Sequence, residues 1–381
     1  MKHTLSILST YSADLFGICS ALYELGGMCV MHDASGCNST YNAHDEPRWY
    51  TMDSMVYISA LTERDAIMGN DKKLIDDIVY TANTLSPKFI VVCGSIIPNM
   101  MGTDFKAIAK IIERKTDIPT FGINTNGMDT YLKGSSIAFD TLVKRFATSD
   151  IAKTERLSVN ILGATPLDYS VNGSVDSMVR WLSDNQIEVV SCLAMGTSLQ
   201  EVGAMGSASV NLVVSYNGLA VAETLYREFG TPYVVGVPIG LEYSKLLLEA
   251  IKRSADTKEC IKRLDFRNTD AMCDYAIVGE SVQSVSLANA LYLEFGIDAK
   301  VVCPLDYDKD TLSIMDTVVK SEDEVSNVLK SHRYVIADPL YKPITSKDTI
   351  FYRLPHVAFS GRCYSKYIPN TINRSLKDLV L

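Results

Sequence analysis

The chain has 381 residues, of which 47% are hydrophobic and only 21% charged, so a generally disordered protein is excluded. The formal net charge of -9 and the lack of a basic block argue against nucleic acid as a partner, because phosphate binding needs clustered positive charge. Nine cysteines in a chain of this length are too few for a disulfide-dense secreted scaffold. No run reaches the ~20 apolar residues of a membrane helix, and the first 25 residues lack a signal-peptide core. We therefore expect a reduced, cytoplasmic protein that does not bind a membrane.

Short apolar runs alternate along the chain with longer amphipathic segments. The predicted strands, in chain order, are 28–32, 89–93, 120–123, 158–162, 188–193, 211–215, 233–237, 275–278, 299–303 and 334–337. The predicted helices are 71–85, 103–116, 175–185, 219–229, 241–254 and 282–295. Continuous apolar strands separated by helices indicate parallel sheets covered on both faces, so the predicted fold class is α/β.

Two polar stretches, 149–156 and 252–270, predict domain boundaries. They divide the chain into three Rossmann-like parallel-sheet domains with a cleft between them. The first, 1–155, carries the cysteines considered below, the second is 156–255, and the third, 256–381, includes the C-terminal segment.

Two cysteines lie where sites form in parallel sheets, at the carboxyl ends of predicted strands. Cys37 follows the strand 28–32 in a loop that also holds Gly36, and Cys93 ends the strand 89–93 before Gly94. The glycines let the backbone approach whatever the sulfurs bind, and their N–H groups are available to sulfide or thiolate. The alternative is that both thiols are small buried hydrophobic groups, and position alone leaves the two interpretations about equal. Two thiolates are too few for an iron–sulfur cluster within one chain, but a symmetric dimer supplies two more.

Several segments resemble the nitrogenase component 1 proteins. The loop from His32 to Cys37 resembles their His-Gly-Pro-x-Gly-Cys loop, and residues 62–74 resemble their Glu-x-Asp-x-x-Phe-Gly-Gly-x-x-Lys-Leu segment. Cys93 with the downstream residues 101–104 resembles the next cysteine loop, which runs on to Ile-Gly-Asp-Asp. The run 210–216 resembles an apolar strand that ends at a cysteine in the family. The matches occur in order over most of the chain.

The resemblance implies an iron–sulfur oxidoreductase with a [4Fe–4S] cluster that Cys37 and Cys93 ligate and two subunits share. The partner subunit is a second copy or a paralogous subunit, and a separate ATP-hydrolysing iron protein delivers low-potential electrons. The family includes dark-operative protochlorophyllide reductase, the nickel-tetrapyrrole cyclase and scaffolds of cofactor assembly. The implied function is reduction of an unidentified substrate, and the alternative is a non-catalytic scaffold or carrier for metallocluster assembly. A cluster-free sugar- or nucleotide-binding protein, in which both thiols are inert and buried, is a further alternative.

Departures from the family pattern narrow these expectations. No cysteine lies in residues 6–11, near the position of a third cluster cysteine, so a four-iron cluster fits better than an eight-iron one. Ser215 stands where the catalytic cofactor of nitrogenase is bound by a cysteine, so dinitrogen reduction is not expected. Asp33 replaces a loop glycine, and either bonds its own backbone or ligates the cluster.

The substrate side of the site has weaker candidates. The catalytic candidates are His44, as a proton donor, and Arg48, as a binder of an anionic or planar ligand. A loop at a subunit interface would also account for both residues. The loops 192–198, 215–218 and 279–281, together with His356 and 360–364, are expected to face the cleft. A further metallocofactor or a tetrapyrrole is expected there.

Overall fold

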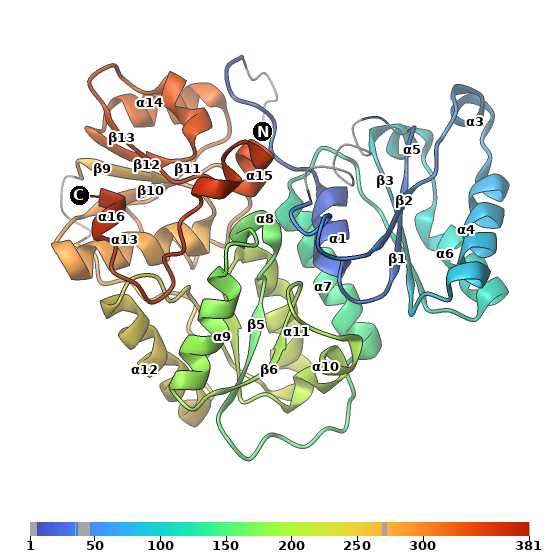
Figure 1. Cartoon of the computed structure of the whole chain (residues 1–381), viewed down its shortest axis with the longest axis horizontal. Coiled ribbons are helices and arrows are strands. Elements are labelled where there is room, and N and C mark those ends of the chain that lie inside the picture. Colours follow the sequence, from blue (N-terminus) through green and yellow to red (C-terminus); the bar gives the residue numbers. More distant parts are fainter. Residues whose placement is uncertain (1–5, 35, 37–45, 269–272, 381) are drawn as a thin grey trace.

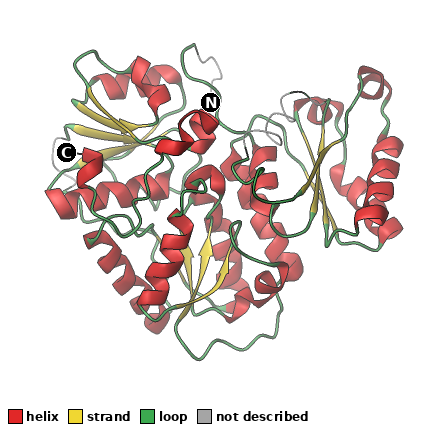
Figure 2. Cartoon of the chain, viewed as in Figure 1, coloured by secondary structure: helices red, strands yellow, loops and turns green. Residues whose placement is uncertain are grey.

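A computed structural model of the chain describes residues 6–34, 36, 46–268 and 273–380. These residues form three parallel sheets flanked by helices (Figures 1 and 2). Cys37 and His44 lie outside the described residues. No helix among the described residues is both long and apolar enough to cross a membrane.

The first sheet has the strand order β2-β1-β3-β4 and lies on the right in Figure 1. Its strands are β1 (Met28–His32), β2 (Met55–Ile58), β3 (Ile90–Gly94) and β4 (Thr120–Ile123). The helices are α1 (Asp14–Leu22), α3 (Glu63–Met68), α4 (Asp71–Leu85), α5 (Ile96–Met101), α6 (Phe105–Thr116) and α7 (Tyr131–Phe146). Alternate strand residues face opposite sides, so Val30 and Val92 pack with α4 and α6, whereas Cys29 and Cys93 belong to the main core with α1 and α7.

The second sheet has the order β6-β5-β7-β8. Its strands are β5 (Ser158–Leu162), β6 (Glu188–Cys192), β7 (Val210–Val213) and β8 (Tyr233–Val235). The helices are α8 (Pro166–Tyr169), α9 (Ser174–Asp184), α10 (Leu199–Ala204), α11 (Leu219–Phe229) and α12 (Glu242–Thr257), with 3₁₀ segments η2 (Met205–Ser207) and η3 (Tyr216–Gly218).

The third sheet has the order β11-β10-β9-β12-β13. Its strands are β9 (Tyr275–Val278), β10 (Ala299–Cys303), β11 (Thr317–Val318), β12 (Tyr334–Ala337) and β13 (Ile350–Arg353). The helices are α13 (Ser281–Phe295), α14 (Glu322–Lys330), α15 (Val357–Ser360) and α16 (Lys377–Val380), with 3₁₀ segments η4 (Pro339–Ile344) and η5 (Gly361–Tyr367). All ten predicted strands are present, with ends shifted by one or two residues at β3, β6, β7 and β8.

Helices α1 and α7 cross at close range between the first and second sheets (Figure 1). A Cβ atom on Gly17 would lie 2.0 Å from the carbonyl oxygen of Tyr131, and one on Gly134 would lie 1.8 Å from that of Asp14. The missing side chains therefore let the two backbones touch. The Asp14 carboxylate also accepts the N–H groups of Asn126 and Gly127, which fixes the start of α1 against the loop before α7.

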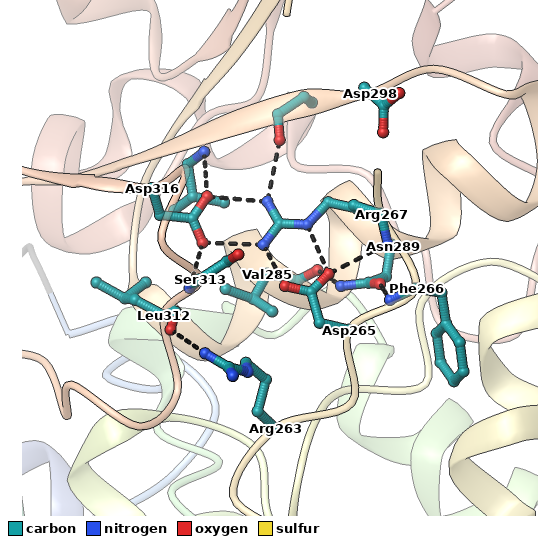
Figure 3. A network of polar contacts seen from close by, with 12 residues as sticks. Arg263, Asp265, Phe266, Arg267, Val285, Asn289, Asp298, Leu312, Ser313 and Asp316 are labelled. Atoms are coloured by element: carbon teal, nitrogen blue, oxygen red, sulfur yellow. Dashed lines mark hydrogen bonds and ion pairs between the residues drawn. The ribbon is translucent and has the colours of Figure 1, made fainter. Parts of the chain in front are cut away.

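The segment that leads from α12 to the third sheet is held by a buried arginine (Figure 3). The guanidinium of Arg267 is bonded to the carboxylates of Asp265 and Asp316 and to the carbonyl oxygen of Ala299. Asp316 also accepts the N–H of Val301 in β10. Because the arginine and Asp316 side chains are fully buried, this network fixes the linker to β10 of the third sheet.

Candidate functional site

Cys93 lies in β3 on the face of the first sheet that packs against α1. Its thiol is fully buried, and its Sγ atom lies 3.8 Å from the carbonyl oxygen of Val30, a weak hydrogen bond. The thiols of Cys29 and Cys93 both lie beside that of Cys19 on α1. Hydrogen bonds to these two thiols, together with burial, raise the pKa of Cys19 well above its ordinary value. The chain thus places three buried thiols on the face of this sheet that packs against α1.

Gly36 and Gly94, the two glycines predicted to lie beside the cysteines, require glycine for different structural reasons. A Cβ atom on Gly94 would lie 2.3 Å from the Phe105 ring, and the Gly94 N–H already donates to the hydroxyl of Thr125. Tight packing and a local hydrogen bond account for this glycine, and its predicted role beside a bound cluster stays a prediction. Gly36 has φ +89°, with open space where a Cβ would be, so its backbone conformation favours glycine.

Polar groups lie at the carboxyl end of the same sheet, although His32 is on the face opposite Cys93, beside Phe105. The hydroxyl of Ser95, two residues further on, is buried and has no hydrogen-bond partner among the described residues. His32, at the end of β1, shares a 2.7 Å hydrogen bond between its Nδ1 atom and the Ser59 hydroxyl, and burial lowers its pKa. Asp33 is tied through its backbone, since its N–H donates to Ser59 and its carbonyl accepts from the N–H of Leu61.

Arg48 connects two parts of the chain and is not presented to a ligand. Its side chain is 3% exposed and forms ion pairs with Glu46 and Glu24 at 2.7 and 2.9 Å. The guanidinium also donates to the carbonyl oxygens of Ser20 in α1 and Ala194 after β6. These contacts use its donors within the chain, so the structure argues against the predicted role in binding an anionic or planar ligand.

A pocket lies between the second sheet, the third sheet and the segment after β13. Its empty volume, including the part open to solvent, is about 720 Å³. Most lining side chains are apolar, and the polar ones include Asp168 of α8, Glu280 and Gln283 at the start of α13, and His356. No cysteine, lysine or arginine is among the described residues that line it.

Asp168 is a buried carboxylate that joins three parts of the chain. Its Oδ1 atom accepts the hydroxyl of Tyr131 from α7 and lies 3.4 Å from Nε2 of His356. Its Oδ2 atom accepts the hydroxyl of Thr165 and the side-chain amide of Asn217. Burial and this carboxylate raise the pKa of Tyr131 well above its ordinary value, so the tyrosine stays a proton donor.

Glu280 caps α13 beside the same pocket. Its carboxylate accepts the N–H groups of Val282 and Gln283 within the helix and the N–H of Tyr216 from η3. The side chain is 1% exposed, and burial, followed by the charge of Asp168, raises the pKa of Glu280 to about 7. Near neutral pH this carboxyl group therefore exchanges a proton inside the pocket wall.

A metallocofactor does not fit the described lining of this pocket. Ser215 has a buried hydroxyl without a partner in the part of the chain that the structure describes, and it does not line the pocket. The described residues contain no group of three or more His, Cys, Asp or Glu side chains that could hold a metal ion. Both pocket carboxylates already accept hydrogen bonds from the chain. The described lining thus offers no thiolate to a second metal group, and its carboxylates are engaged with the chain.

Residues 24–332 match the family described as nitrogenase component 1 type oxidoreductase. The chain belongs to this family. The resemblance predicted from the cysteine loops is thereby confirmed. A solved structure titled "Nitrogenase Cp1 at pH 6.5" superimposes with a TM-score of 0.70 over 98% of this chain and 92% of that one, at 16% identity. This match confirms the predicted α/β fold with parallel sheets.

The curated relatives of this nitrogenase-like chain include cofactor biosynthesis proteins and reductase subunits. The nitrogenase iron-molybdenum cofactor biosynthesis protein NifE of Clostridium pasteurianum is 28% identical over 53% of this chain and 44% of its own length. A light-independent protochlorophyllide reductase subunit of Leptolyngbya boryana is 26% identical over 51% of this chain and 38% of its own length. The chain thus matches less than half the length of these relatives. The family includes both an oxidoreductase subunit and a cofactor biosynthesis protein.

The predicted cleft loops of this nitrogenase-like chain divide into two groups. Glu280 and His356 line the pocket, and η3 supports it through the bonds of Tyr216 and Asn217. The loop after β6 does not line it, because Ala194 and Gly196 bond instead to Arg48 and Glu24. Asp168 and Gln283 were not among the residues predicted from the sequence. Their position just after a strand, as with Gly279 and Glu280, was the available signal.

Proposed function

We propose that the chain is a subunit of a nitrogenase-like iron–sulfur oxidoreductase that reduces an organic substrate in the pocket beside Asp168, Glu280 and His356. A [4Fe–4S] cluster shared by two subunits is held by Cys37 and Cys93 of each, and a separate ATP-hydrolysing iron protein supplies electrons. The partner subunit is a second copy or a paralogue. A dinitrogen reductase is not proposed, because Ser215 replaces a cysteine.

Two features of the first sheet support this ligand assignment. Cys93 lies near the carboxyl end of a central strand, where the loop that carries Cys37 also begins. The Ser95 hydroxyl, which has no partner among the described residues, lies two residues along the chain and is able to donate to a thiolate. The cluster would supply single electrons at low potential.

The pocket supports the proposed reduction. Reduction of an organic molecule requires protons as well as electrons, and the pocket contains groups that could supply them. Glu280, with a pKa of about 7, holds a transferable proton near neutral pH. Oδ1 of Asp168 lies 3.4 Å from Nε2 of the His356 imidazole, and both residues line the pocket. The apolar lining limits water beside these groups. Glu280 is accordingly the proposed proton donor, and Asp168 and His356 are the polar groups beside it in the pocket.

The second candidate is a scaffold or carrier for metallocluster assembly. It is favoured by the similarity to a cofactor biosynthesis protein of Clostridium pasteurianum. Such a protein keeps the cluster cysteines but has no need of a proton donor in the pocket. Turnover with reductant, ATP and a cognate iron protein separates the two functions: the scaffold binds iron without consuming electrons.

The deciding experiment is anaerobic purification followed by iron and sulfide quantitation and EPR spectroscopy. We expect about two irons per chain, because four irons are shared by two chains. The iron and the EPR signal should be lost in Cys37→Ala and in Cys93→Ala. Cys192→Ala, another buried cysteine, is the matched control and should retain both. A colourless protein without iron after reconstitution would overturn the proposal.

A further inference from the structure

We propose that the pocket binds a neutral, mainly apolar organic molecule through an acceptor atom of the carbonyl or ring-nitrogen type, with Gln283 and His356 as the donors. The inference deepens the proposed function, because it names the substrate class of the same pocket. It rests on the proposed function only for the statement that this molecule is reduced. The binding itself follows from the unused hydrogen-bonding groups of the pocket.

The first donor is the side-chain amide of Gln283, in the first turn of α13. The Gln283 backbone N–H donates to Glu280, but the side-chain Nε2 atom is buried and has no partner among the described residues. A buried polar group without a partner is costly, so native structures rarely keep one without a reason. Gln283 lines the pocket, so a bound acceptor atom would satisfy its N–H group.

The second donor is Nε2 of His356. The N–H of Ala358 donates to Nδ1 of this imidazole at 3.2 Å, so Nδ1 is an acceptor and the ring hydrogen lies on Nε2. Nε2 is buried and lacks a hydrogen bond of good geometry to any described residue, although Oδ1 of Asp168 lies 3.4 Å away. The ring is held in place by stacking on Phe359, with the ring centroids 4.5 Å apart. The pocket wall thus contains two buried N–H donors without a hydrogen-bond partner among the described residues.

The charges of the pocket exclude ionic ligands of either sign. An anion would face Asp168 and Glu280 with no lysine or arginine among the described lining residues to balance it. A cation would need a carboxylate with room for its N–H groups, but Asp168 already has four polar neighbours and Glu280 accepts three backbone N–H groups. A neutral ligand with an acceptor atom satisfies the unused donors without these penalties.

The remaining lining favours an apolar molecular body. Val237, Ile239, Leu287, Leu354 and Ile372 are among the side chains that face the pocket. Burial of a ligand against them is favourable by the hydrophobic effect, at ~25 cal/mol per Å² of apolar surface. The ligand is therefore predominantly hydrocarbon, with its acceptor directed at Gln283 and His356.

The test compares four probes that share one bicyclic ring: the ketone 1-tetralone, the hydrocarbon tetralin, tetralin-1-carboxylate and 1-aminotetralin. Binding is measured by ligand-observed NMR and calorimetry on the protein as purified, at pH 7.5. We expect the ketone to bind ~10-fold more tightly than the carboxylate or the ammonium probe, and more tightly than the hydrocarbon.

Two variants assign the donors. Gln283→Leu should weaken binding of the ketone by about 3- to 10-fold and leave the hydrocarbon unaffected, because one hydrogen bond is removed. Gln200→Leu, at an exposed position of α10, is the matched control and should bind all four probes as the native chain does. Gln283→Leu should also leave the unfolding temperature unchanged or raise it, because the amide that it removes has no partner among the described residues. If that variant does not fold, His356→Phe tests the second donor with the same probes.

The result that overturns the inference is preferential binding of a charged probe, or a ketone affinity that Gln283→Leu and His356→Phe leave unchanged. Because the binding test needs no cluster, its outcome is independent of the iron content. If the protein contains iron but does not prefer the ketone, the proposed function stands and the inference about the ligand fails. If the protein contains no iron but prefers the ketone, the inference about the ligand stands and the proposed function fails.

Discussion

Nε2 of His356 lies 3.4 Å from Oδ1 of Asp168, the same oxygen that accepts the hydroxyl of Tyr131. The tyrosine comes from α7 beside the first sheet, the aspartate from α8 beside the second, and the histidine from the segment after β13 of the third. The pocket is therefore completed only when the parts around all three sheets have packed together. Changes that loosen the packing between these parts should therefore also disrupt the contacts of Asp168.

Replacing Asp168 should change the titration of Glu280. In Asp168→Asn the negative charge near Glu280 is removed, so the pKa of Glu280 should fall from about 7 toward its ordinary value of 4.5. The measurement is the pH titration of the Glu280 carboxyl carbon by ¹³C NMR. Asp176→Asn, at an exposed position in the first turn of α9, should leave the titration unchanged. An unaltered Glu280 titration in Asp168→Asn would show that burial alone causes the shift.

Glu280 should also make the stability of the chain depend on pH. The folded-state pKa lies above that of the unfolded chain, so the folded state holds an extra proton between pH 4.5 and about 7. The free energy of unfolding therefore decreases as pH rises through this window, by at most ~3 kcal/mol. Urea unfolding at pH 5, 6 and 7 measures it, and Glu280→Gln should lose this component. Parallel curves for the two proteins would contradict the prediction.

Glu322 should stabilise the folded conformation of residues 6–8 at pH values above about 4.5. Its carboxylate accepts the N–H groups of Ser6, Ile7 and Leu8, and these bonds lower its pKa to about 2. This contribution is complete above the unfolded-state pKa of about 4.5 and is lost as pH falls through 2. Hydrogen exchange at these amides should accelerate in Glu322→Gln. The exposed neighbour Asp323→Asn should exchange at the native rate.

Arg48 should prove to be a structural residue. Removing it leaves the carboxylates of Glu46 and Glu24 without their cation. The carbonyl oxygen of Ala194, in the loop after β6, also loses the hydrogen bond that it accepts from the guanidinium. We expect Arg48→Met to lower the free energy of unfolding by ~3–5 kcal/mol, a cost typical of breaking a buried ion pair. Arg180→Met, on an exposed part of α9, should lower it by less than ~1 kcal/mol. An Arg48→Met variant of native stability would contradict the structural role.

The fold was predictable where strands are buried on both faces and less so at the edges of the sheets. The three strands absent from the prediction, Met55–Ile58, Thr317–Val318 and Ile350–Arg353, are all edge strands. Their side chains are largely half-buried or exposed, so no continuous apolar run marks them. Helix Tyr131–Phe146 was also missed, because its contacts with α1 and α11 bury side chains on more than one face.

The candidate site shows the same division. Cys93 and Glu280 were predictable because each lies at or next to the carboxyl end of an apolar strand. The role of Gln283 was not, because an unpartnered amide is recognised only when its surroundings are known. Arg48 in turn suggested ligand binding by its residue type, whereas its ion pair with Glu24 and its bond to Ala194 form only in the folded chain.

The crossing of α1 and α7 should tolerate no side chain at its centre. Gly17→Ala and Gly134→Ala each place a Cβ atom within 2.0 Å of a backbone oxygen on the facing helix, so the helices must separate. Overpacking should lower the free energy of unfolding by ~1–3 kcal/mol or more. Gly203→Ala in α10 is the matched control, since its Cβ would meet no described atom closer than 3.5 Å. Helix propensity should make that variant as stable as the native chain or more so, by ~0.5–1 kcal/mol. Chemical denaturation of the three variants measures these effects, and equal stabilities would mean that the helices do not touch as described.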